Sequence, residues 1–212
     1  FFYPDKVERV IPYSRPGSML YHRLQIDSGT ETIPPKIAPY KDYYLHAQLY
    51  GFFPYMASPT SGIVIRRDLA LRLIPLPTEH VRISADAFLV RAAALLGQVI
   101  GIPDVLAVYR VHGENAWYGK RMIPKSPVFM AELEKYLNRK LVEAGKRPVI
   151  DFYHSMYAIA HIPQSTVELA RLGVSVFSRH ANLVTLRFML RTLLRAVQRG
   201  TSPASSGCAR QN

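Results

Sequence analysis

The middle of the chain alternates apolar runs with short polar connections. Residues 61–65 (SGIVI) form an apolar run that predicts a buried strand, and the Arg-Arg-Asp sequence after it predicts a short helix that ends at Pro75. The next segment has the pattern of an apolar helix, with Ser84 as the expected N-cap and Gly97 as the residue that ends it.

Short strands are predicted on both sides of this block. Residues 18–24 have a strand-like pattern, and residues 99–102 and 105–109 predict two further strands with a turn at 103–104. The segment 33–59 holds five prolines and many aromatic residues, so we expect no long regular elements there. It is either an aromatic-lined loop over a binding cleft or a loop that packs on the core.

The second half of the chain is predicted to be helical. Its helices are expected at residues 126–145, 151–161, 165–173 and 178–199. Mixed strands and helices in the first half, followed by helices, predict an α/β fold with a helical C-terminal part.

The chain is strongly basic. Among its 212 residues, 27 Lys and Arg stand against 15 Asp and Glu, which gives a formal net charge of +12 at pH 7. This balance favours phosphate-bearing partners, which include nucleic acid, anionic lipid headgroups and nucleotide sugars. The single cysteine, Cys208, excludes an internal disulfide and favours a reducing compartment.

Neither a membrane-spanning segment nor a targeting segment is visible in the sequence. No stretch reaches the roughly twenty apolar residues that a spanning helix needs. The chain begins at Phe1 rather than Met, and its first residues lack a basic segment followed by a long apolar core. We therefore expect it to be the later part of a longer protein.

Three motifs occur in a fixed order in the first 120 residues. They are TSGIVIRR at 60–67, ADAFL at 85–89 and LAVYRVHGEN at 106–115. This ordered set resembles the second half of the bacterial family-2 glycosyltransferases. The resemblance implies a Rossmann-like α/β fold of the GT-A type, of which residues 1–120 would be the acceptor half. Residues 121–200 would then be a helical extension, and residues 201–212 a disordered tail.

In that family a nucleotide-binding half comes first and ends in an Asp-x-Asp metal motif. The motif normally precedes a segment similar to FYPDKVER, which stands here at residues 2–9, and no Asp-x-Asp occurs in this sequence. The resemblance therefore implies that the chain is a fragment, inactive alone. A divalent ion, Mn²⁺ or Mg²⁺, would bind only with the missing half present.

Asp86 matches the catalytic base of the family. In an inverting transfer, this carboxylate takes the proton of the acceptor hydroxyl as the hydroxyl attacks the sugar. The first turn of a helix suits a negative charge, because the helix dipole favours it there. The same effect would stabilise the helix without any catalytic role, and the resemblance favours the catalytic interpretation. The family often has an acidic residue before the base, whereas this chain has Ala85.

His112 matches a residue that helps to bind the divalent ion in relatives, and imidazole suits Mn²⁺ better than Mg²⁺. The alternative is a hydrogen-bonded loop histidine. Four further residues are predicted to bind substrate: Ser61 and Gly62 by close approach of the backbone, Arg110 by a bidentate contact to diphosphate, and Trp117 by stacking on a sugar. The structural alternative is a turn at the start of a strand for Ser61 and Gly62, a surface salt bridge for Arg110, and core or lid packing for Trp117.

The predicted helix at 178–199 carries an arginine at every fourth position beside a broad apolar face. The arginines are Arg187, Arg191, Arg195 and Arg199. Such a helix is suited to an anionic membrane surface, and equally to docking on the domain with its arginines in water. We expect a cytoplasmic protein, with a peripheral position on the inner face of the membrane if the first interpretation holds.

These features together predict a glycosyltransferase fragment that transfers a sugar from a nucleotide-diphosphate donor to an acceptor hydroxyl with inversion. The expected setting is cell-surface polysaccharide or glycolipid synthesis, with a saccharide or lipid-linked acceptor. The alternatives are a basic module without catalysis that binds membrane or nucleic acid, and a noncatalytic remnant that packs with a partner chain. No zinc spacing or RNA-binding motif occurs, so no specific nucleic acid is expected.

Overall fold

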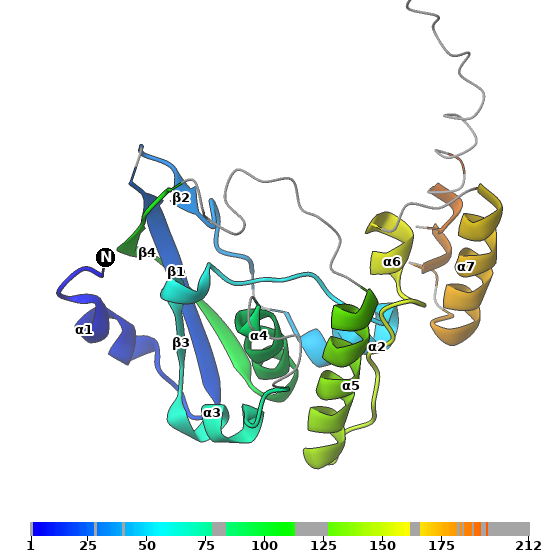
Figure 1. Cartoon of the computed structure of the whole chain (residues 1–212), viewed down its shortest axis with the longest axis horizontal. Coiled ribbons are helices and arrows are strands. Elements are labelled where there is room, and N and C mark those ends of the chain that lie inside the picture. Colours follow the sequence, from blue (N-terminus) through cyan, green and yellow to red (C-terminus); the bar gives the residue numbers. More distant parts are fainter. Residues whose placement is uncertain are drawn as a thin grey trace, which may run out of the picture.

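The computed structural model describes residues 2–27, 29–39, 41–77, 84–112, 127–161 and 166–181, and scattered positions between 183 and 194. Within them the chain has a mixed α/β fold, with a four-stranded sheet at one end and a group of helices at the other (Figure 1). The predicted α/β class is confirmed, and the mixed sheet is compatible with a Rossmann-like fold. The assignment to the GT-A type stays a prediction.

The sheet is built around strand β1 (Ser18–Ile26). β1 pairs in parallel with β4 (Gln98–Tyr109) along its whole length. Two short strands, β2 (Thr32–Ile33) and β3 (Ile63–Ile65), pair antiparallel with different parts of β1. β1 is therefore the central strand, and its residues are buried or half-buried along its whole length, including the polar Ser18 and His22.

The two faces of the sheet contact different elements. On one face Met19 belongs to the main apolar cluster, which includes helix α4 (Ala85–Leu96). On the other face its neighbour Leu20 packs with Val10 of helix α1 (Lys6–Val10), which leads into the 3₁₀ turn η1 (Ile11–Tyr13). Neighbouring residues alternate between the clusters with the period of two that a strand imposes.

Helix α4 lies inside the molecule rather than on its surface. It contacts the sheet on one side and α2 (Tyr43–Tyr50), α3 (Arg67–Leu73) and α5 (Pro127–Glu143) on the others. A helix surrounded in this way must be apolar on nearly all sides, which is the pattern that its sequence shows. Ser84 and Gly97 take the predicted N-cap and C-cap positions, although Ser84 makes no side-chain cap bond.

Gly97 is required at the end of α4 by close packing, not by a left-handed backbone. Its φ of −142° is extended and open to any residue. A Cβ at this position would lie 2.2 Å from the carbonyl oxygen of Gly17 and 2.9 Å from the side chain of Leu69. Gly97 therefore ends α4 as predicted, and a glycine is needed there because two chain segments are in close contact.

Two strand predictions are corrected. β4 is one strand rather than two with a turn, because residues 22 and 23 of β1 pair with Ile102 and Val105 and leave residues 103–104 as a bulge. The predicted strand at 61–65 begins two residues later. Residues 61 and 62 belong to the 3₁₀ turn η2 (Thr60–Gly62), and β3 itself is only partly buried.

The Pro- and Tyr-rich segment contains a helix that its composition hides. α2 is capped by Asp42, whose Oδ1 accepts the N–H of Leu45 at 2.9 Å, and it ends at Gly51, which has a φ of 76°. Phe52 and Phe53 follow directly and are buried in the main cluster. For these two aromatic residues the packing interpretation is confirmed.

The helical second half follows the prediction in part. α5 confirms the helix predicted at 126–145, whose expected cap Ser126 lies outside the described residues. α6 (Met156–His161) begins later than expected, because Ser155 accepts the N–H of Ala158 at 3.1 Å and so caps the helix there.

The last predicted boundaries are wrong. α7 (Thr166–Arg179) continues through Gly173, where a Cβ would lie 2.7 Å from Sδ of Met189, so this glycine permits packing and does not end the helix. Residue 178 therefore belongs to α7. Beyond it the described positions from Leu183 onward are helical.

None of the helices in the described residues is long and apolar enough to cross a bilayer. α5 shares the main apolar cluster with α4 and the sheet, so the helical part contacts the α/β part through these two helices. The division of the chain at residue 120 and the disordered tail at 201–212 stay predictions.

We expect Gly97→Ala to destabilise the protein by about 1–3 kcal/mol, because the added Cβ cannot fit without moving the Gly17 backbone. Urea unfolding followed by circular dichroism measures the effect. Gly29→Ala is the matched control, since a Cβ there meets no atom within 4 Å. Equal midpoints for the two variants would contradict this role of Gly97.

Candidate functional site

The η2 turn brings the predicted base together with the predicted close-approach residues. The hydroxyl of Thr60 donates to Oδ2 of Asp86 at 3.1 Å. On the other side of the turn, the carbonyl oxygen of Ser61 accepts a hydrogen bond from Nζ of Lys6 at 3.0 Å. The turn therefore connects the first turn of α4 with α1, and places a carboxylate and an ammonium group at its two ends.

Gly62 makes the turn fit against the sheet. Its N–H donates to the carbonyl of Pro59 at 2.8 Å, which closes the turn. A Cβ on Gly62 would lie 2.2 Å from the hydroxyl oxygen of Ser58 and 3.0 Å from the carbonyl oxygen of His22. The close approach predicted for Gly62 thus occurs toward buried protein atoms. Its contact with substrate stays a prediction.

Asp86 is partly buried and has a second hydroxyl beside it. The side chain of Tyr55 donates to the carbonyl of Ser58 at 3.0 Å and also interacts with the Asp86 carboxylate. Burial, and then the negative charge of Asp86, raise the pKa of Tyr55 well above its usual value. Tyr55 is therefore neutral at physiological pH, and its single O–H proton is directed to the carbonyl of Ser58, which leaves Thr60 as the hydroxyl that donates to the carboxylate.

Arg91 places a buried positive charge near this carboxylate. The side chain is 8% exposed and lies over the rings of Phe52 and Tyr55, with its guanidinium carbon 5.3 and 5.6 Å from their centroids. Burial lowers the pKa of Arg91 to about 10, against the opposing effects of Tyr157, Tyr55 and Asp86. Arg91 is therefore still a cation at pH 7.

Arg91 and Tyr55 were not predicted as part of the site. In the sequence, Arg91 stands out as the one charged residue within the apolar run at 87–96. A charge inside a buried helix needs a partner, and this could have marked Arg91 as a residue of interest. No comparable signal marks Tyr55, which is one of many tyrosines in a segment read as a loop.

Two further titratable side chains, Lys6 and His22, lie on the β1 side of the η2 turn. Nζ of Lys6 lies 3.8 Å from the ring centroid of Phe2, and partial burial lowers the pKa of Lys6. His22 is fully buried in β1, with Nδ1 2.9 Å from the carbonyl oxygen of Arg23. Burial, assisted by the charge of Lys6, lowers the pKa of His22, so the imidazole is neutral at pH 7.

The remaining predicted residues lie at the end of β4 or beyond it. Arg110 and His112 are exposed, and the intervening N–H of Val111 donates to Oδ1 of Asp27 in the turn after β1 at 3.0 Å. Trp117 lies outside the described residues.

The start of α4 and the end of β4 lie toward the same end of the α/β unit, because α4 leads directly into β4 and packs on it. The convergence of Asp86 and His112 on one pocket stays a prediction.

Nothing in the described part of the chain groups three or more His, Cys, Asp or Glu side chains as metal ligands. The described residues therefore do not fit a divalent ion by themselves. His112 as a ligand for Mn²⁺ or Mg²⁺ is an expectation that needs further ligands.

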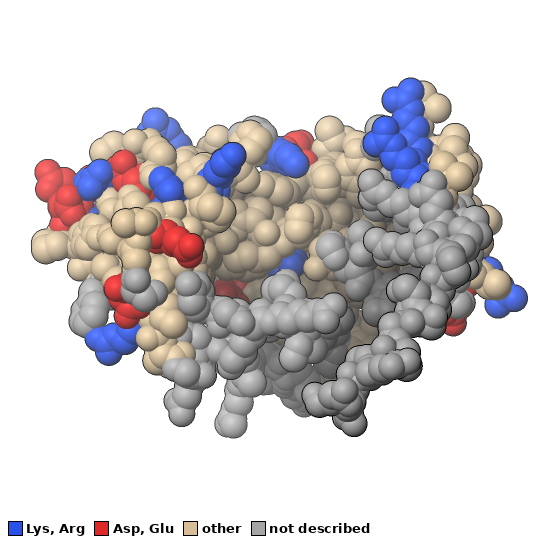
Figure 2. Space-filling model, turned by 90° about the horizontal axis from the view of Figure 1, so that it is seen from above, with Lys and Arg blue, Asp and Glu red and all other residues tan. Residues whose placement is uncertain are grey.

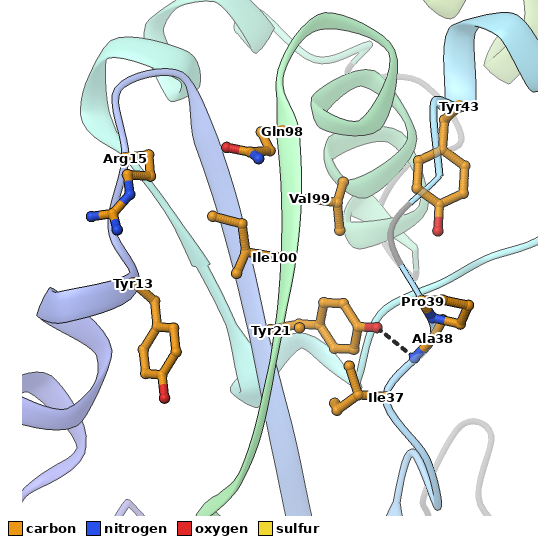
Figure 3. Close-up of a pocket in the computed structure, with 11 residues that line it drawn as sticks. Tyr13, Arg15, Tyr21, Ile37, Ala38, Pro39, Tyr43, Gln98, Val99 and Ile100 are labelled. Carbon is orange, nitrogen blue, oxygen red and sulfur yellow. Dashed lines mark hydrogen bonds between the residues drawn. The ribbon is translucent and has the colours of Figure 1, made fainter.

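A cavity of about 350 Å³ lies away from Asp86, around the start of β4 (Figure 3). Its polar lining residues are Tyr13, Arg15, Tyr21, Tyr43 and Gln98. In Figure 3 the ring of Tyr21 crosses the sheet face, and its hydroxyl accepts the N–H of Ala38 at 3.1 Å. The 12-residue α4, roughly 18 Å long, separates this cavity from Asp86. None of the predicted site residues lines it.

A second cavity of about 450 Å³ lies between α5 and α7. Asp151 lines it and is paired with Arg179 of α7 and with His154, whose Nδ1 is 2.9 Å from Oδ1. These contacts attach α7 to the body of the protein.

The charge of the visible face is spread unevenly (Figure 2). Over the end that carries α1 and the sheet, Lys and Arg alternate with Asp and Glu. At the end that carries α6 and α7, blue side chains gather with little red beside them. The described surface on this side therefore does not show one continuous basic track of the kind that binds duplex nucleic acid.

Comparison with curated proteins finds 26% identity over 168 residues with an uncharacterized glycosyltransferase of Nostoc sp. (strain PCC 7120). The match covers 72% of this chain and 51% of that protein, so the chain spans about half the length of the curated relative. No protein-family model and no solved structure matches. The chain is therefore similar to part of a protein that is named as a glycosyltransferase.

The buried His22 predicts a loss of stability in mild acid. Its folded-state pKa lies below the unfolded value of about 6.5, so the unfolded chain binds more protons as the pH falls through 6.5. The free energy of unfolding should therefore drop between about pH 7.5 and 5.5, by at most about 1.4 kcal/mol per pH unit.

Urea unfolding at several pH values measures this slope for the native protein and for His22→Asn, in which the amide can replace Nδ1. We expect a smaller slope in the variant. Some slope should remain, because burial also lowers the pKa of His46. Identical slopes would show that His22 is not a source of the acid sensitivity.

Proposed function

We propose that this chain is the acceptor half of an inverting glycosyltransferase of the GT-A type, with Asp86 as the base. The observation that carries the proposal is the environment of Asp86. Its carboxylate stands in the first turn of a helix and accepts a hydrogen bond from Thr60 of the η2 turn, which also carries Ser61 and Gly62. The similarity to a protein named as a glycosyltransferase supports the same class of reaction.

Asp86 would act by taking one proton. The acceptor hydroxyl attacks the anomeric carbon of the donor sugar, the bond to the nucleoside diphosphate breaks with its electron pair on the diphosphate, and the hydroxyl proton passes to the carboxylate. Attack from the side opposite the leaving group inverts the anomeric centre. Thr60 would hold the carboxylate in a single orientation, which lowers the cost of aligning it with the acceptor.

The other predicted site residues enter the proposal as expectations. Arg110 and Trp117 would contact the donor diphosphate and a sugar face, and the Ser61–Gly62 backbone would approach the substrate. His112 would supply one ligand of a divalent ion whose other ligands lie outside the described residues. The nucleotide-sugar donor and the saccharide or lipid-linked acceptor of polysaccharide or glycolipid synthesis are part of the same proposal.

Asp86→Asn in the full-length protein should lower turnover by roughly 10²–10⁴-fold, because the amide cannot accept the acceptor proton. Donor affinity, measured by isothermal titration calorimetry, should stay nearly unchanged. Asp104→Asn is a matched control, since Asp104 forms a surface ion pair with Arg9 at 2.9 Å. Wild-type turnover by folded Asp86→Asn protein would remove Asp86 from the mechanism.

We also propose that the segment after α7 binds an anionic membrane surface, which would place the enzyme at the inner face of the membrane. Leu183, Leu190 and Leu194 are 72%, 50% and 62% exposed, and Arg187 and Arg191 are exposed among them. On a helix this spacing puts all five side chains on one face. Exposed leucines with interspersed cations are suited to the boundary between acyl chains and anionic headgroups.

Replacing the three exposed leucines by serine should abolish flotation with liposomes that contain anionic lipid, because the inserted apolar area is lost. Val142→Ser is the matched control, since Val142 is 59% exposed on α5. Liposomes of neutral lipid should bind the native protein weakly. Unchanged flotation of the triple variant would rule out this surface.

A further inference from the structure

β4 is an edge strand of the sheet. One side of β4 pairs with β1, and its other side pairs with none of the named strands in the described part of the chain. Near the C-terminal end of β4, this outer side meets the start of the chain. Phe2 forms an antiparallel bridge with Ala107, and the N–H of Tyr3 donates to the carbonyl of Leu106 at 3.1 Å. Part of the outer edge is therefore already paired with an extended segment.

The first residues of β4 leave the same edge open. The N–H of Gln98 donates to the carbonyl of Gly17 at 3.0 Å, so the backbone of Gln98 faces β1. Backbone groups alternate between the two sides of a strand, so the N–H and C=O groups of Val99 and Gly101 point outward. The described hydrogen bonds give these outward groups no partner. Pro103, which has no N–H, begins the bulge that separates this open stretch from the paired one.

The cavity of about 350 Å³ lies against this open stretch, because all four residues at 98–101 line it. Its two walls lie on opposite sides of β4 (Figure 3). The wall on the α1 face is polar. It holds Tyr13, which is 40% exposed, and the exposed Arg15, beside Gln98.

The wall on the α4 face is mostly apolar and is formed by Tyr43 and the segment 37–39. Tyr21 fixes this segment, because its hydroxyl accepts the N–H of Ala38 at 3.1 Å. Gly101 permits the close approach, since a Cβ there would lie 2.2 Å from Cγ2 of Ile37 and 2.9 Å from the ring of Tyr21. The fold therefore sets a polar wall and an apolar wall beside an open strand edge.

We propose that an extended peptide segment of a partner protein adds to the sheet here, as a strand beside residues 98–101 of β4. Its backbone would bond to the outward groups of Val99 and Gly101. Its side chains would alternate between apolar residues, which face the α4-side wall, and acidic residues, which face Arg15. In such strand addition, main-chain hydrogen bonds provide affinity and the alternate side chains provide specificity.

Two observations select an acidic polypeptide as the occupant. The pairing of Tyr3 with Leu106 shows that this edge accepts an extended chain as its neighbour. The net charge of +12 and the guanidinium of Arg15 favour an acidic partner. This contact is independent of the chemistry proposed at Asp86.

Amide hydrogen exchange of the 212-residue chain, followed by NMR, tests the pairing. The probe is a short blocked peptide that alternates valine and glutamate. At saturation it should slow exchange at Val99 and Gly101 by roughly tenfold or more, and leave Ile100 and Ile102 nearly unchanged, because their N–H groups already face β1. Unprotected Val99 and Gly101 at millimolar peptide would overturn the proposal. So would protection of these amides by an oligosaccharide of glucuronic acid alone, which would make the cavity a saccharide site.

Two control peptides keep the side chains and change only the backbone. One is N-methylated at its valine amides and the other at its glutamate amides, which lie on opposite edges of an extended peptide. One control should bind nearly as well as the parent peptide, and the other roughly tenfold more weakly, because only one edge can pair with β4. Equal affinities of the two controls would contradict strand addition.

The preference for acidic side chains is tested by charge exchange. Arg15→Glu should weaken binding of the valine–glutamate peptide by roughly fivefold and strengthen binding of a valine–lysine peptide. Arg171→Glu is the matched control, because it makes the same change at an exposed position on α7. Equal effects of the two substitutions would overturn the predicted contact with Arg15.

Discussion

A positive charge inside a helix that is buried on nearly all sides constrains the rest of this structure. Moving an ion out of water costs on the order of several kcal/mol unless opposite charge and hydrogen bonds replace the lost hydration. In α4 the described contacts of the guanidinium are two aromatic rings and one helix carbonyl. The path of the segment after α2 over α4 is therefore linked to a single arginine.

The η2 turn extends this constraint to the sheet. Thr60 binds Asp86, Ser61 binds Lys6, and Gly62 packs on Ser58 and on the backbone of His22. Three consecutive residues thus connect α4, α1 and β1. A displacement of any of these elements would move the carboxylate, which is the property expected of a base that must meet its acceptor with a fixed orientation.

The sequence predicted the features that depend on local pattern. α4 was found from its periodicity and its terminal Ser84 and Gly97, and α5 from its start at Pro127. Features that depend on contacts between distant segments were missed or wrong. The bulge in β4 depends on its pairing with β1, and the passage of α7 through Gly173 depends on Met189.

In the candidate site, too, the residues marked by a local motif were predicted and those that depend on contacts between distant segments were not. The resemblance to the family-2 glycosyltransferases selected Asp86, because a motif is local in sequence. It did not select Tyr55 or Arg91, since the contact between them arises only when the segment after α2 folds over α4. The similarity to part of a protein named as a glycosyltransferase agrees in class with the resemblance.

The most direct test of the account is a crystal structure of the full-length protein with a nonhydrolysable nucleotide sugar and an acceptor. The account predicts that the acceptor hydroxyl lies within hydrogen-bonding distance of the Asp86 carboxylate, and that this carboxylate still accepts the hydrogen bond of Thr60. The anomeric carbon of the donor should lie on the side of the acceptor hydroxyl that faces away from Asp86. Both ligands bound elsewhere, for example in the cavity at the start of β4, would contradict the account.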